Sequence, residues 1–528
     1  MTPHEYVPLV RGVWTVEQVR AAEQAVIARV GEAVLMRRAA FGVAVQAAEL
    51  LRQQTGGVAG RRVSLLVGAG NNGGDALWAG AFLCRRGAAV TAVLLAPQRV
   101  HAAGLAALRR RGGRSVEVVD VVEVGAGRSE GGGRVGGGGR ADAAGRVGGG
   151  AGVGRALAAV RDADLVIDGI VGLSAHGPLR PDAAELVAAA GAPIVAVDLP
   201  SGVDPDTGAT DGPAVTATAT VTFGALKPVH VLAPHRCGAL RVVDIGIGTA
   251  LPAPAIRVLD TADIAAAWPV PGPADDKYTQ GVTGVAAGSA TYPGAAVLTA
   301  GAAVLATSGM VRYSGAAADP VRARWPEVIA TGSVSDAGRV QAWVVGPGLG
   351  TGSEGRAAVR HALGAGVPVC VDADAITLLA TDEVLWDARD PGVPVVLTPH
   401  DREFARIAGD VGTDRVAAAR RAAAKLGATV LLKGHSTVMA DPDGAVLVHP
   451  SSSSWPATAG SGDVLSGLIG ALLAAGLAPL LAAGAAAHVH GLAAVLAARN
   501  APAPASALLA AVPDAIRAVR ASAVTPAR

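Results

Sequence analysis

Short apolar runs alternate with longer helical patterns along most of the chain. In its first half these runs are residues 63–67, 90–95, 165–167, 194–197 and 221–223. In its second half they recur at residues 285–287, 342–345, 367–371, 393–397 and 429–432. Continuous apolar strands that alternate with helices are typical of a parallel sheet with helices on both faces. The pattern therefore predicts an α/β protein built from layered αβα domains.

A chain of 528 residues is too long for a single hydrophobic core, and changes in composition suggest where it divides. Residues 1–60 have the apolar spacing of helices. Residues 250–273 are rich in Pro and Ala, which is typical of a junction between domains. We expect one domain over residues 1–250 and a second over residues 256–528, which ends in long Ala- and Leu-rich helices.

Three further stretches stand out by composition. Residues 112–154 are rich in Gly, Arg and Val, and so little apolar bulk cannot offset the entropy lost on ordering the backbone. Most of this stretch is predicted to be a flexible surface insertion without a catalytic part. Residues 282–311 and 464–498 are uncharged, but their apolarity comes mostly from alanine. We expect buried helices there rather than membrane spans, with packing or capping roles for His488 and His490.

The charge balance and the cysteines exclude several classes of protein. The 45 basic and 43 acidic residues nearly cancel, so neither a nucleic acid nor an anionic membrane is expected as a partner. The three cysteines lie far apart and form no CxxC pair, which speaks against a disulfide framework or a zinc site. With no signal peptide recognisable at the N-terminus, we expect a cytoplasmic protein.

A glycine turn after the first predicted strand suggests a dinucleotide site. Gly68, Gly70 and Gly73 fit the GxGxxG pattern. A domain that transfers hydride also needs an acid near the end of the next strand, for the ribose hydroxyls. The next apolar run ends at residue 95 without an acid. A dinucleotide is therefore expected here, but not bound for hydride transfer.

Polar side chains follow three strands of the first domain. Because the carboxyl ends of parallel strands share one edge of a sheet, these side chains are expected to converge. They are Asn71, Asn72, Asp75, Asp168, Asp198 and Ser201. Capping of the helices that follow is the alternative that the pattern leaves open.

Residues 71–75, 198–202 and 222–228 together resemble the NAD(P)H-hydrate epimerase family, over roughly residues 10–248. The resemblance implies a Rossmann-like αβα domain in which Asp198 is the acid–base group. It also implies a potassium ion held by Asn72, Asp168 and Ser201. The implied substrate contacts are Asn71, Asn72, Gly73, Gly74, Asp75, Gly172, Leu173, Ser174, Ala175, His176, Gly177, Pro178 and Asp198. Val229 stands where the family usually has glycine, which leaves the role of Lys227 open.

The second domain carries an anion-binding pattern at residues 460–463. Gly460 and Gly462 allow close approach of a ligand to the backbone, and the free N–H groups of the following helix attract phosphate. Asp463 stands where a carboxylate takes a proton from a hydroxyl that faces a phosphoryl group. Lys433, after another predicted strand, adds a cation. An ordinary helix cap is the alternative.

With residues 277–295 and 346–350, this series resembles the ribokinase-like superfamily, and within it the ADP-dependent NAD(P)H-hydrate dehydratases. The resemblance covers about residues 256–515. It implies magnesium and ADP, with the nucleotide on Lys433, Gly434, His435, Ser436, Thr437 and Gly462. The implied substrate contacts are Ala295, Gly348, His400 and Asp463. Arg402 replaces a glycine that the family commonly has after the histidine, whereas Glu403 keeps the family's acid.

The sequence thus predicts a two-site repair enzyme, with an epimerase first and a dehydratase second. NAD(P)H-hydrate and ADP are the expected partners, and a homo-oligomer is expected. One alternative is a ribokinase-like kinase of a vitamin alcohol fused to a non-catalytic dinucleotide-binding domain. A hydride-transferring dehydrogenase is a distant third possibility, because the acid for the ribose is missing.

Overall fold

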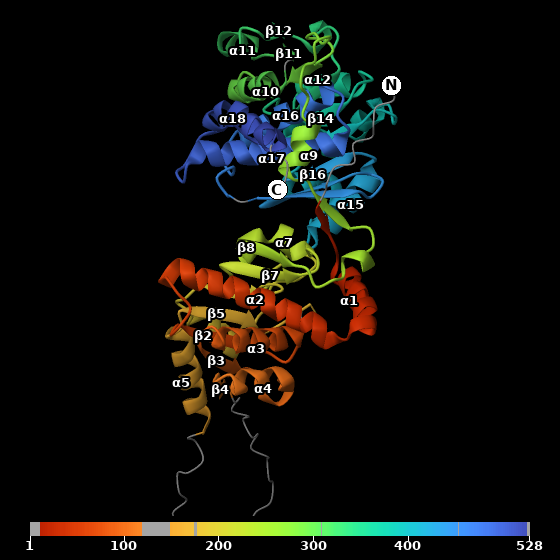
Figure 1. The fold of residues 1–528 in the computed structure, drawn as a ribbon. Coiled ribbons are helices and arrows are strands. Elements are labelled where there is room, and N and C mark those ends of the chain that lie inside the picture. The colour runs from red at the N-terminus through yellow and green to blue at the C-terminus, as the bar shows by residue number, and fades with distance from the viewer. Residues whose placement is uncertain (1–10, 119–147, 174–176, 308, 452, 525–528) are drawn as a thin grey trace, which may run out of the picture. The chain divides into compact units, whose positions relative to one another are not determined.

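The computed structural model describes residues 11–118, 148–173, 177–307, 309–451 and 453–524 (Figure 1). These residues form two compact units, each with its own sheet. The N-terminal unit consists mainly of Trp14–His230 and His235–Pro252. The C-terminal unit consists mainly of Ala253–Arg528, together with the short strand β1 (Arg11–Val13).

The described part of the N-terminal unit contains a seven-stranded parallel sheet in the order β4-β3-β2-β5-β6-β7-β8. Its strands are β2 (Arg62–Val67), β3 (Ala89–Leu94), β4 (Arg114–Glu117), β5 (Leu165–Gly169), β6 (Ile194–Val197), β7 (Ala219–Phe223) and β8 (Ala239–Val243). The five strands predicted in this unit are confirmed. From β2 the chain builds the sheet outward first through β3 and β4, and then on the other side from β5. Ligands of such sheets bind where the direction changes, beyond the carboxyl ends of the strands.

Helices cover both faces of this sheet, as the alternating pattern predicts. One apolar cluster joins the sheet to α1 (Val16–Val30), α2 (Glu32–Thr55), α3 (Asn71–Cys84) and α4 (Ala102–Arg110). A second cluster joins the opposite face to α5 (Gly148–Arg161) and α6 (Pro181–Ala188). Leu65 and Leu66, consecutive on β2, belong to different clusters, which is the period-two alternation of a strand. Two short helices, α7 (Pro228–Leu232) and α8 (Pro234–Cys237), precede β8.

Two segments that the sequence marks as irregular contain regular elements. The predicted insertion over residues 112–154 contains β4 near its start and the beginning of α5, from residue 148, at its end; residues 119–147 lie outside the described part. Residues 250–273, predicted as a junction, contain β9 (Ile256–Val258) and α9 (Thr261–Ala267). β4 pairs with the preceding strand β3, whereas β9 pairs with β1, more than two hundred residues earlier in the chain.

The C-terminal unit is built on an eleven-stranded sheet in the order β1-β9-β18-β17-β16-β15-β14-β13-β10-β11-β12. Its main parallel strands are β10 (Val282–Ala286), β11 (Met310–Ser314), β12 (Ile329–Thr331), β13 (Ala342–Val345), β14 (Val369–Val371), β15 (Val395–Leu397) and β16 (Thr429–Leu432). The antiparallel strands β17 (Ser436–Ala440) and β18 (Val446–Pro450) extend it. The five strands predicted in this unit are confirmed.

Helices again lie on both faces. One large cluster contains residues of α10 (Pro293–Ala306), α16 (Ser461–Ala474), α17 (Pro479–Ala498) and α18 (Ala505–Val524). Val344 of β13 points into this cluster, whereas its neighbour Trp343 packs edge-on against His361 of α12 (Ser353–Leu363). The remaining helices are α11 (Ala318–Arg324), α13 (Asp374–Thr381), α14 (Asp401–Ala408) and α15 (Arg415–Leu426). The chain therefore contains two three-layer αβα units.

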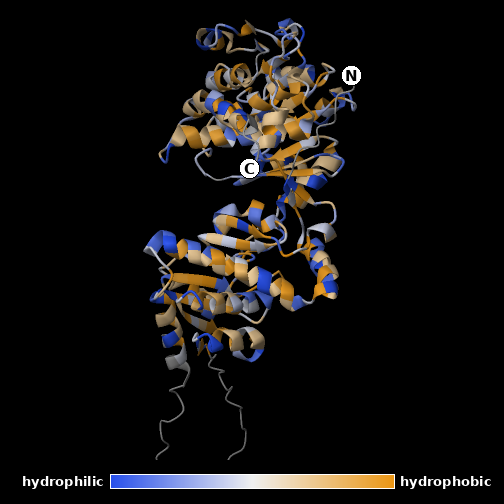
Figure 2. Cartoon of the chain, in the orientation of Figure 1, coloured by the Kyte–Doolittle hydropathy of each residue, from blue (hydrophilic) through white to orange (hydrophobic). Residues whose placement is uncertain are grey.

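The two uncharged stretches are divided among several elements. Residues 282–311 contain β10, α10 and the start of β11, and residues 464–498 contain most of α16 and all of α17. Among the described residues, α17 alone is long and apolar enough to cross a membrane, and 56% of its apolar window is buried inside the fold. Figure 2, a ribbon coloured by residue hydropathy, shows hydrophobic residues along many strands and hydrophilic residues on many helices.

Candidate active sites

The first candidate site is a cavity of about 740 Å³ in the N-terminal unit, at the carboxyl ends of β2, β5 and β6. The turn before α3 lies against the end of β5, and a Cβ on Gly68 would be 1.8 Å from the carbonyl oxygen of Ile170. Only glycine permits this approach. Of the predicted site residues, the cavity is lined by Asn71, Asn72, Asp75, Gly172, Leu173, Gly177, Pro178 and Asp198.

Asn72, Asp168 and Ser201 form an oxygen-rich cluster beside this cavity. Asp168 accepts hydrogen bonds from the backbone N–H of Ser201 at 2.9 Å and from its hydroxyl at 2.7 Å. The Asn72 side-chain amide donates to the carbonyl oxygens of Val171, at 3.0 Å, and Val197, at 2.6 Å. The side chains of Asp168 and Ser201 therefore meet, and the Asn72 side chain reaches the backbone that follows β5 and that ends β6. Helix capping does not describe this contact set, because Asp168 and Ser201 belong to different strand ends.

Asp198, at the end of β6, is held by a buried ion pair. Lys227 Nζ lies 2.5 Å from Asp198 Oδ1, and Lys227 is fully buried. The same oxygen accepts hydrogen bonds from the Thr222 hydroxyl at 3.0 Å and from the Phe223 N–H at 3.3 Å. Val229, in place of the family's glycine, does not displace Lys227 from this pair. Lys227 is thus a site residue whose role the sequence left open.

Two further carboxyl groups face the cavity. Burial, followed by the charge of Asp198, raises the pKa of Asp75 well above its ordinary range. Its Oδ1 is buried and has no hydrogen-bond partner among the described residues. Burial also raises the pKa of Glu23. This residue lines the cavity but was not predicted from the sequence. Glu23 could have been found from the sequence, because it stands between Val19 and Val26 on the apolar side of one helix.

The remaining predicted contacts of the first site lie elsewhere or were not described. Gly73 and Gly74 lie inside α3 and do not line the cavity. A Cβ on Gly73 would lie 2.5 Å from the Gly68 carbonyl oxygen, so this glycine serves the packing of the turn. Substrate contact by these two residues remains a prediction. Ser174, Ala175 and His176 lie outside the described residues.

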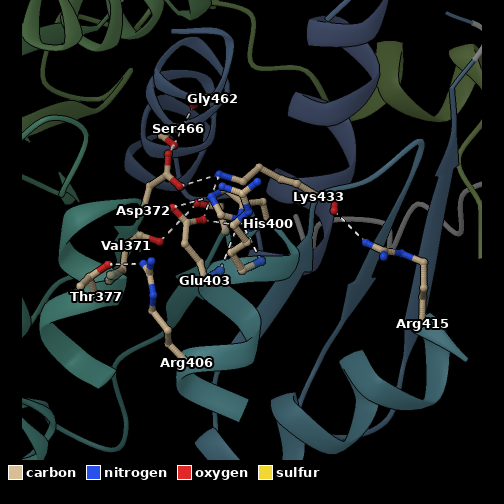
Figure 3. A network of polar contacts seen from close by, with 12 residues as sticks. Val371, Asp372, Thr377, His400, Glu403, Arg406, Arg415, Lys433, Gly462 and Ser466 are labelled. Carbon is tan, nitrogen blue, oxygen red and sulfur yellow. Dashed lines mark hydrogen bonds and ion pairs between the residues drawn. The ribbon is translucent and has the colours of Figure 1, made fainter. Parts of the chain in front are cut away.

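The second candidate site lies in the C-terminal unit, where β14, β16 and α16 meet (Figure 3). Lys433 Nζ is 2.8 Å from Asp372 Oδ1 and 3.7 Å from Glu403 Oε2. The Ser466 hydroxyl donates to Asp372 Oδ2 at 2.7 Å. Burial, followed by the charge of Asp372, raises the pKa of Asp463 to about 7, although Lys433 opposes the shift. A carboxyl group that titrates near neutral pH is suited to general base catalysis.

The glycine turn of this site faces the lysine. A Cβ on Gly462 would lie 3.6 Å from Lys433 Nζ and 3.7 Å from Asp372 Oδ2. Gly460 has φ +84°, a conformation that favours glycine, and α16 begins at the next residue. The free N–H groups of this helix and the ammonium group of Lys433 therefore surround one small volume, which suits a phosphate.

The other predicted nucleotide residues follow Lys433 in the chain. Gly434 and His435 are exposed in the turn before β17, Ser436 is buried on that strand, and Thr437 is half-buried. The Ser436 hydroxyl has no hydrogen-bond partner among the described residues. Contact between these four residues and a nucleotide remains a prediction.

On the substrate side, Ala295 and Gly348 lie together, since a Cβ on Gly348 would be 2.8 Å from Ala295 Cβ. His400 caps α14: its Nδ1 accepts the N–H groups of Arg402 at 3.1 Å and Glu403 at 3.3 Å. Arg402 is exposed, so the family's glycine is replaced here without disturbing the cap. The four substrate contacts predicted for this unit remain predictions.

Asp372 and Ser466 were not predicted as site residues. Asp372 directly follows the apolar run of β14, which is the same signal that singled out Asp198 after β6. Ala373, the next residue, has φ +50°, which L-residues other than Asn and Asp rarely adopt. Such strain is concentrated at functional sites. As expected, His490 packs and caps: its Nε2 lies 3.0 Å from both the hydroxyl and the carbonyl oxygen of Ser461.

Comparisons with known proteins give a match for each of the two units. Residues 32–229 match the family model of the YjeF-related protein N-terminus, and residues 283–514 match that of NAD(P)H-hydrate dehydratase. The bifunctional NAD(P)H-hydrate repair enzyme Nnr of Mycobacterium tuberculosis is 54% identical over 471 residues, which is 88% of this chain and 90% of that protein. The ADP-dependent (S)-NAD(P)H-hydrate dehydratase of Neisseria meningitidis is 44% identical over 233 residues, or 41% of this chain and 77% of its own.

Among solved structures, an ADP/ATP-dependent NAD(P)H-hydrate dehydratase from Bacillus subtilis, co-crystallised with ATP and Mg²⁺, is 28% identical. It aligns with 50% of this chain and 98% of its own, with a TM-score of 0.45. The full-length match and the two family models show that the chain belongs to the family of bifunctional NAD(P)H-hydrate repair enzymes.

Proposed function

We propose that this chain repairs hydrated NADH and NADPH in two steps. The N-terminal unit interconverts the R and S forms of NAD(P)H-hydrate, and the C-terminal unit dehydrates the S form at the expense of ADP. The observation that carries the proposal is a carboxylate site in each unit, with Asp198 paired to Lys227 in one and Asp463 beside Lys433 in the other. Each unit also matches its own family model.

Epimerisation requires the hydroxyl group to leave the ring carbon and water to return to the opposite face. The hydroxyl leaves with a proton, the lone pair of the ring nitrogen forms a planar iminium ion, and water then adds while losing a proton. No electrons are exchanged with a cofactor. Asp198 is the acid–base group that we assign, and its negative charge, together with the polar wall of the cavity, stabilises the cation.

A potassium ion fits the oxygen cluster beside this cavity. Asn72, Asp168 and Ser201 offer amide, carboxylate and hydroxyl oxygens, and the carbonyl oxygens of Val171 and Val197 lie within hydrogen-bond distance of Asn72. Hard oxygen ligands of this kind suit an alkali cation. When bound, the ion would supply fixed positive charge next to the substrate. It would also order the strand ends that carry the cavity.

For dehydration, a hydroxyl group is a poor leaving group and phosphate is a better one. We infer that Asp463 takes the proton of the ring hydroxyl. The hydroxyl oxygen then attacks the terminal phosphorus of ADP, and AMP leaves. The bond between the ring carbon and the ester oxygen then breaks, phosphate departs, and the neighbouring ring carbon loses a proton to water, which restores the ring double bond. The products are NAD(P)H, phosphate and AMP. Lys433 and the N–H groups of α16 hold the phosphates.

Magnesium is expected to accompany the nucleotide. Among the described residues, no three His, Cys, Asp or Glu side chains lie close enough to hold a metal ion by themselves. Mg²⁺ on nucleotide phosphates needs only one or two carboxylates and keeps several waters. Asp372 and Glu403, both beside Lys433, fit that requirement. The ion would supply positive charge to the phosphoryl group.

The setting of the enzyme is part of the proposal. We infer action in the cytoplasm from the three free cysteines, and the lack of a nucleic-acid or membrane partner from the balanced charge of the chain. A homo-oligomer stays a prediction that sedimentation of the purified chain tests.

The test of the proposed function uses the S epimer of NADH-hydrate with ADP and Mg²⁺. We expect the absorbance of reduced nicotinamide to return, with one AMP and one phosphate formed per NADH. Asp463→Asn should abolish this return, and Asp198→Ala should not affect it. A vitamin kinase would instead consume nucleotide with a vitamin alcohol and leave the hydrate unchanged, and that result would overturn the proposal.

A further inference from the structure

His230 is buried beside the Asp198–Lys227 ion pair of the first site and does not line the cavity. It belongs to α7, three residues after Lys227, and only 3% of it is exposed. Its Nδ1 accepts the backbone N–H of Lys227 at 2.9 Å. Its Nε2 lies 2.8 Å from the carbonyl oxygen of Asp198. One imidazole ring therefore touches the backbones of both members of the buried ion pair.

These partners fix the chemical state of the ring. A backbone N–H only donates, so Nδ1 carries no proton. A carbonyl oxygen only accepts, so Nε2 carries the proton and donates it. Burial lowers the pKa of His230 to about 4, in agreement with a neutral ring. His230 is thus a neutral bridge with one donor and one acceptor, both used.

Asp198 benefits from such a bridge because its φ is +68°, in the left-handed region. Aspartate enters this region more readily than most residues with a side chain, but the conformation still carries backbone strain. Its N–H donates to the Val221 carbonyl oxygen at 2.8 Å, and its own carbonyl oxygen accepts from His230. Both peptide groups of the strained residue are therefore anchored. Strain of this kind persists only where surrounding bonds determine the conformation.

The consequence appears at the Asp198 carboxylate. Among the described residues, every hydrogen bond to this group goes to Oδ1, from Lys227, Thr222 and the Phe223 N–H. Oδ2 is left for a ligand in the cavity that Asp198 lines. A rotation of the Asp198 backbone would exchange or tilt the two oxygens. The conformation of the Asp198 backbone therefore determines which of its two carboxylate oxygens faces the substrate.

We propose that His230 is a positioning residue of the epimerase reaction, which locks Asp198 and Lys227 into one geometry so that Asp198 Oδ2 faces the substrate. This inference rests on the proposed function of the N-terminal unit. It differs from a purely structural role, in which the ring only satisfies buried polar groups. A structural role would affect stability and leave the turnover of folded protein unchanged.

Two substitutions separate the two hydrogen bonds. In His230→Asn the amide oxygen replaces Nδ1 as the acceptor for the Lys227 N–H, but the donor to Asp198 is lost. In His230→Gln the longer side chain carries its N–H₂ group to the position of Nε2. Displacement of a reacting group by about 1 Å costs about a hundredfold in rate. We expect epimerase kcat to fall between about tenfold and a hundredfold in the Asn variant, with KM within about twofold, and the Gln variant to recover most of kcat.

The full chain supplies its own controls. Dehydratase kcat on the S epimer, measured in the same sample, should stay at the wild-type value. His101→Asn is the matched variant, because His101 Nδ1 likewise accepts a backbone N–H, that of Gly104 at 3.0 Å, without touching Asp198. Its epimerase kcat should be unchanged. In the Asp198→Asn background, His230→Asn should lower the residual epimerase rate no further.

A wild-type kcat in folded His230→Asn would overturn the inference, as would a change confined to KM. If wild-type protein itself failed to epimerise the hydrate, the proposed function would fail instead. Should the Asn variant not fold, ¹⁵N spectra of His230 in the unaltered chain decide the question. A proton on Nε2 whose resonance shifts when NADPH occupies the cavity supports the proposal. A proton on Nδ1, or an unchanged resonance, overturns it.

Discussion

The pH dependence of dehydration offers a sharp test of the role assigned to Asp463. Burial and the charge of Asp372 raise the pKa of Asp463 to about 7. A general base must be ionised to accept a proton. Below pH 7 most of the Asp463 carboxyl is protonated and cannot act, whereas above pH 7 most of it can. The dehydratase kcat/KM should therefore rise with pH, because this parameter reports the free enzyme.

The size of the rise follows from a single ionisation at about pH 7. The ionised fraction grows from about one tenth at pH 6 to about nine tenths at pH 8, so kcat/KM should rise about tenfold over this interval. An aspartate with an ordinary pKa would be ionised throughout and give a flat profile. Lys433 lowers the pKa of Asp463, so Lys433→Gln should move the midpoint to higher pH.

The assay measures initial rates at limiting S-hydrate and limiting ADP, from the absorbance of reduced nicotinamide. Asp463→Asn serves as the blank at each pH, since it keeps the shape of the side chain but cannot be ionised. A midpoint below pH 5, or a residual rate in Asp463→Asn that follows the same pH profile, would refute the reasoning. Epimerase activity, measured alongside, checks that the N-terminal unit remains folded over this range.

Three other predictions concern the buried groups of the two sites. Lys227→Met leaves the buried Asp198 charge without a partner, so urea unfolding should show the N-terminal unit destabilised by about 3–5 kcal/mol, with recovery when Asp198→Asn is added. A Cβ on Gly462 would meet no atom closer than 3.6 Å, so Gly462→Ala should fold normally. The added methyl group should keep a phosphate from one backbone N–H group and so raise KM for ADP about tenfold or more. An unchanged KM would contradict the phosphate assignment. A Cβ on Gly172 would lie 2.7 Å from Asn72 Oδ1, so Gly172→Ala should need about tenfold more potassium for half-maximal epimerase activity, whereas equal potassium titrations would contradict this site.

The strands that the sequence predicted are those with continuous buried runs. Both faces of β2, β5 and β16 are covered, so every position except Arg62 is buried and most positions are apolar. The edge strands β4 and β8 were missed because most of their residues are partly or fully exposed and include arginine. No local sequence pattern predicts such strands. β1, of three residues, pairs with β9 across more than two hundred residues of chain.

The candidate sites were predictable where chemistry follows a strand end. Asp198 stood out because it follows β6, and the same rule applied to β14 points to Asp372. Asp463 stood out instead by the glycine turn at the start of α16. The partners of these acids could not be found in this way. Lys227 reaches Asp198 across 29 residues, and Lys433 reaches Asp372 across 61. Which cation meets which acid depends on how the strands are ordered in the sheet, and the sequence does not state that order.

The central claim is that one chain carries two sites that act in turn on the same damaged cofactor. The most direct measurement supplies wild-type protein with pure R epimer of NADPH-hydrate, ADP, Mg²⁺ and K⁺, and follows the formation of NADPH. The account predicts full conversion at a rate well above spontaneous epimerisation, and loss of that excess in Asp198→Ala. Conversion no faster than spontaneous epimerisation in the wild type, or an equal rate in the variant, would contradict it.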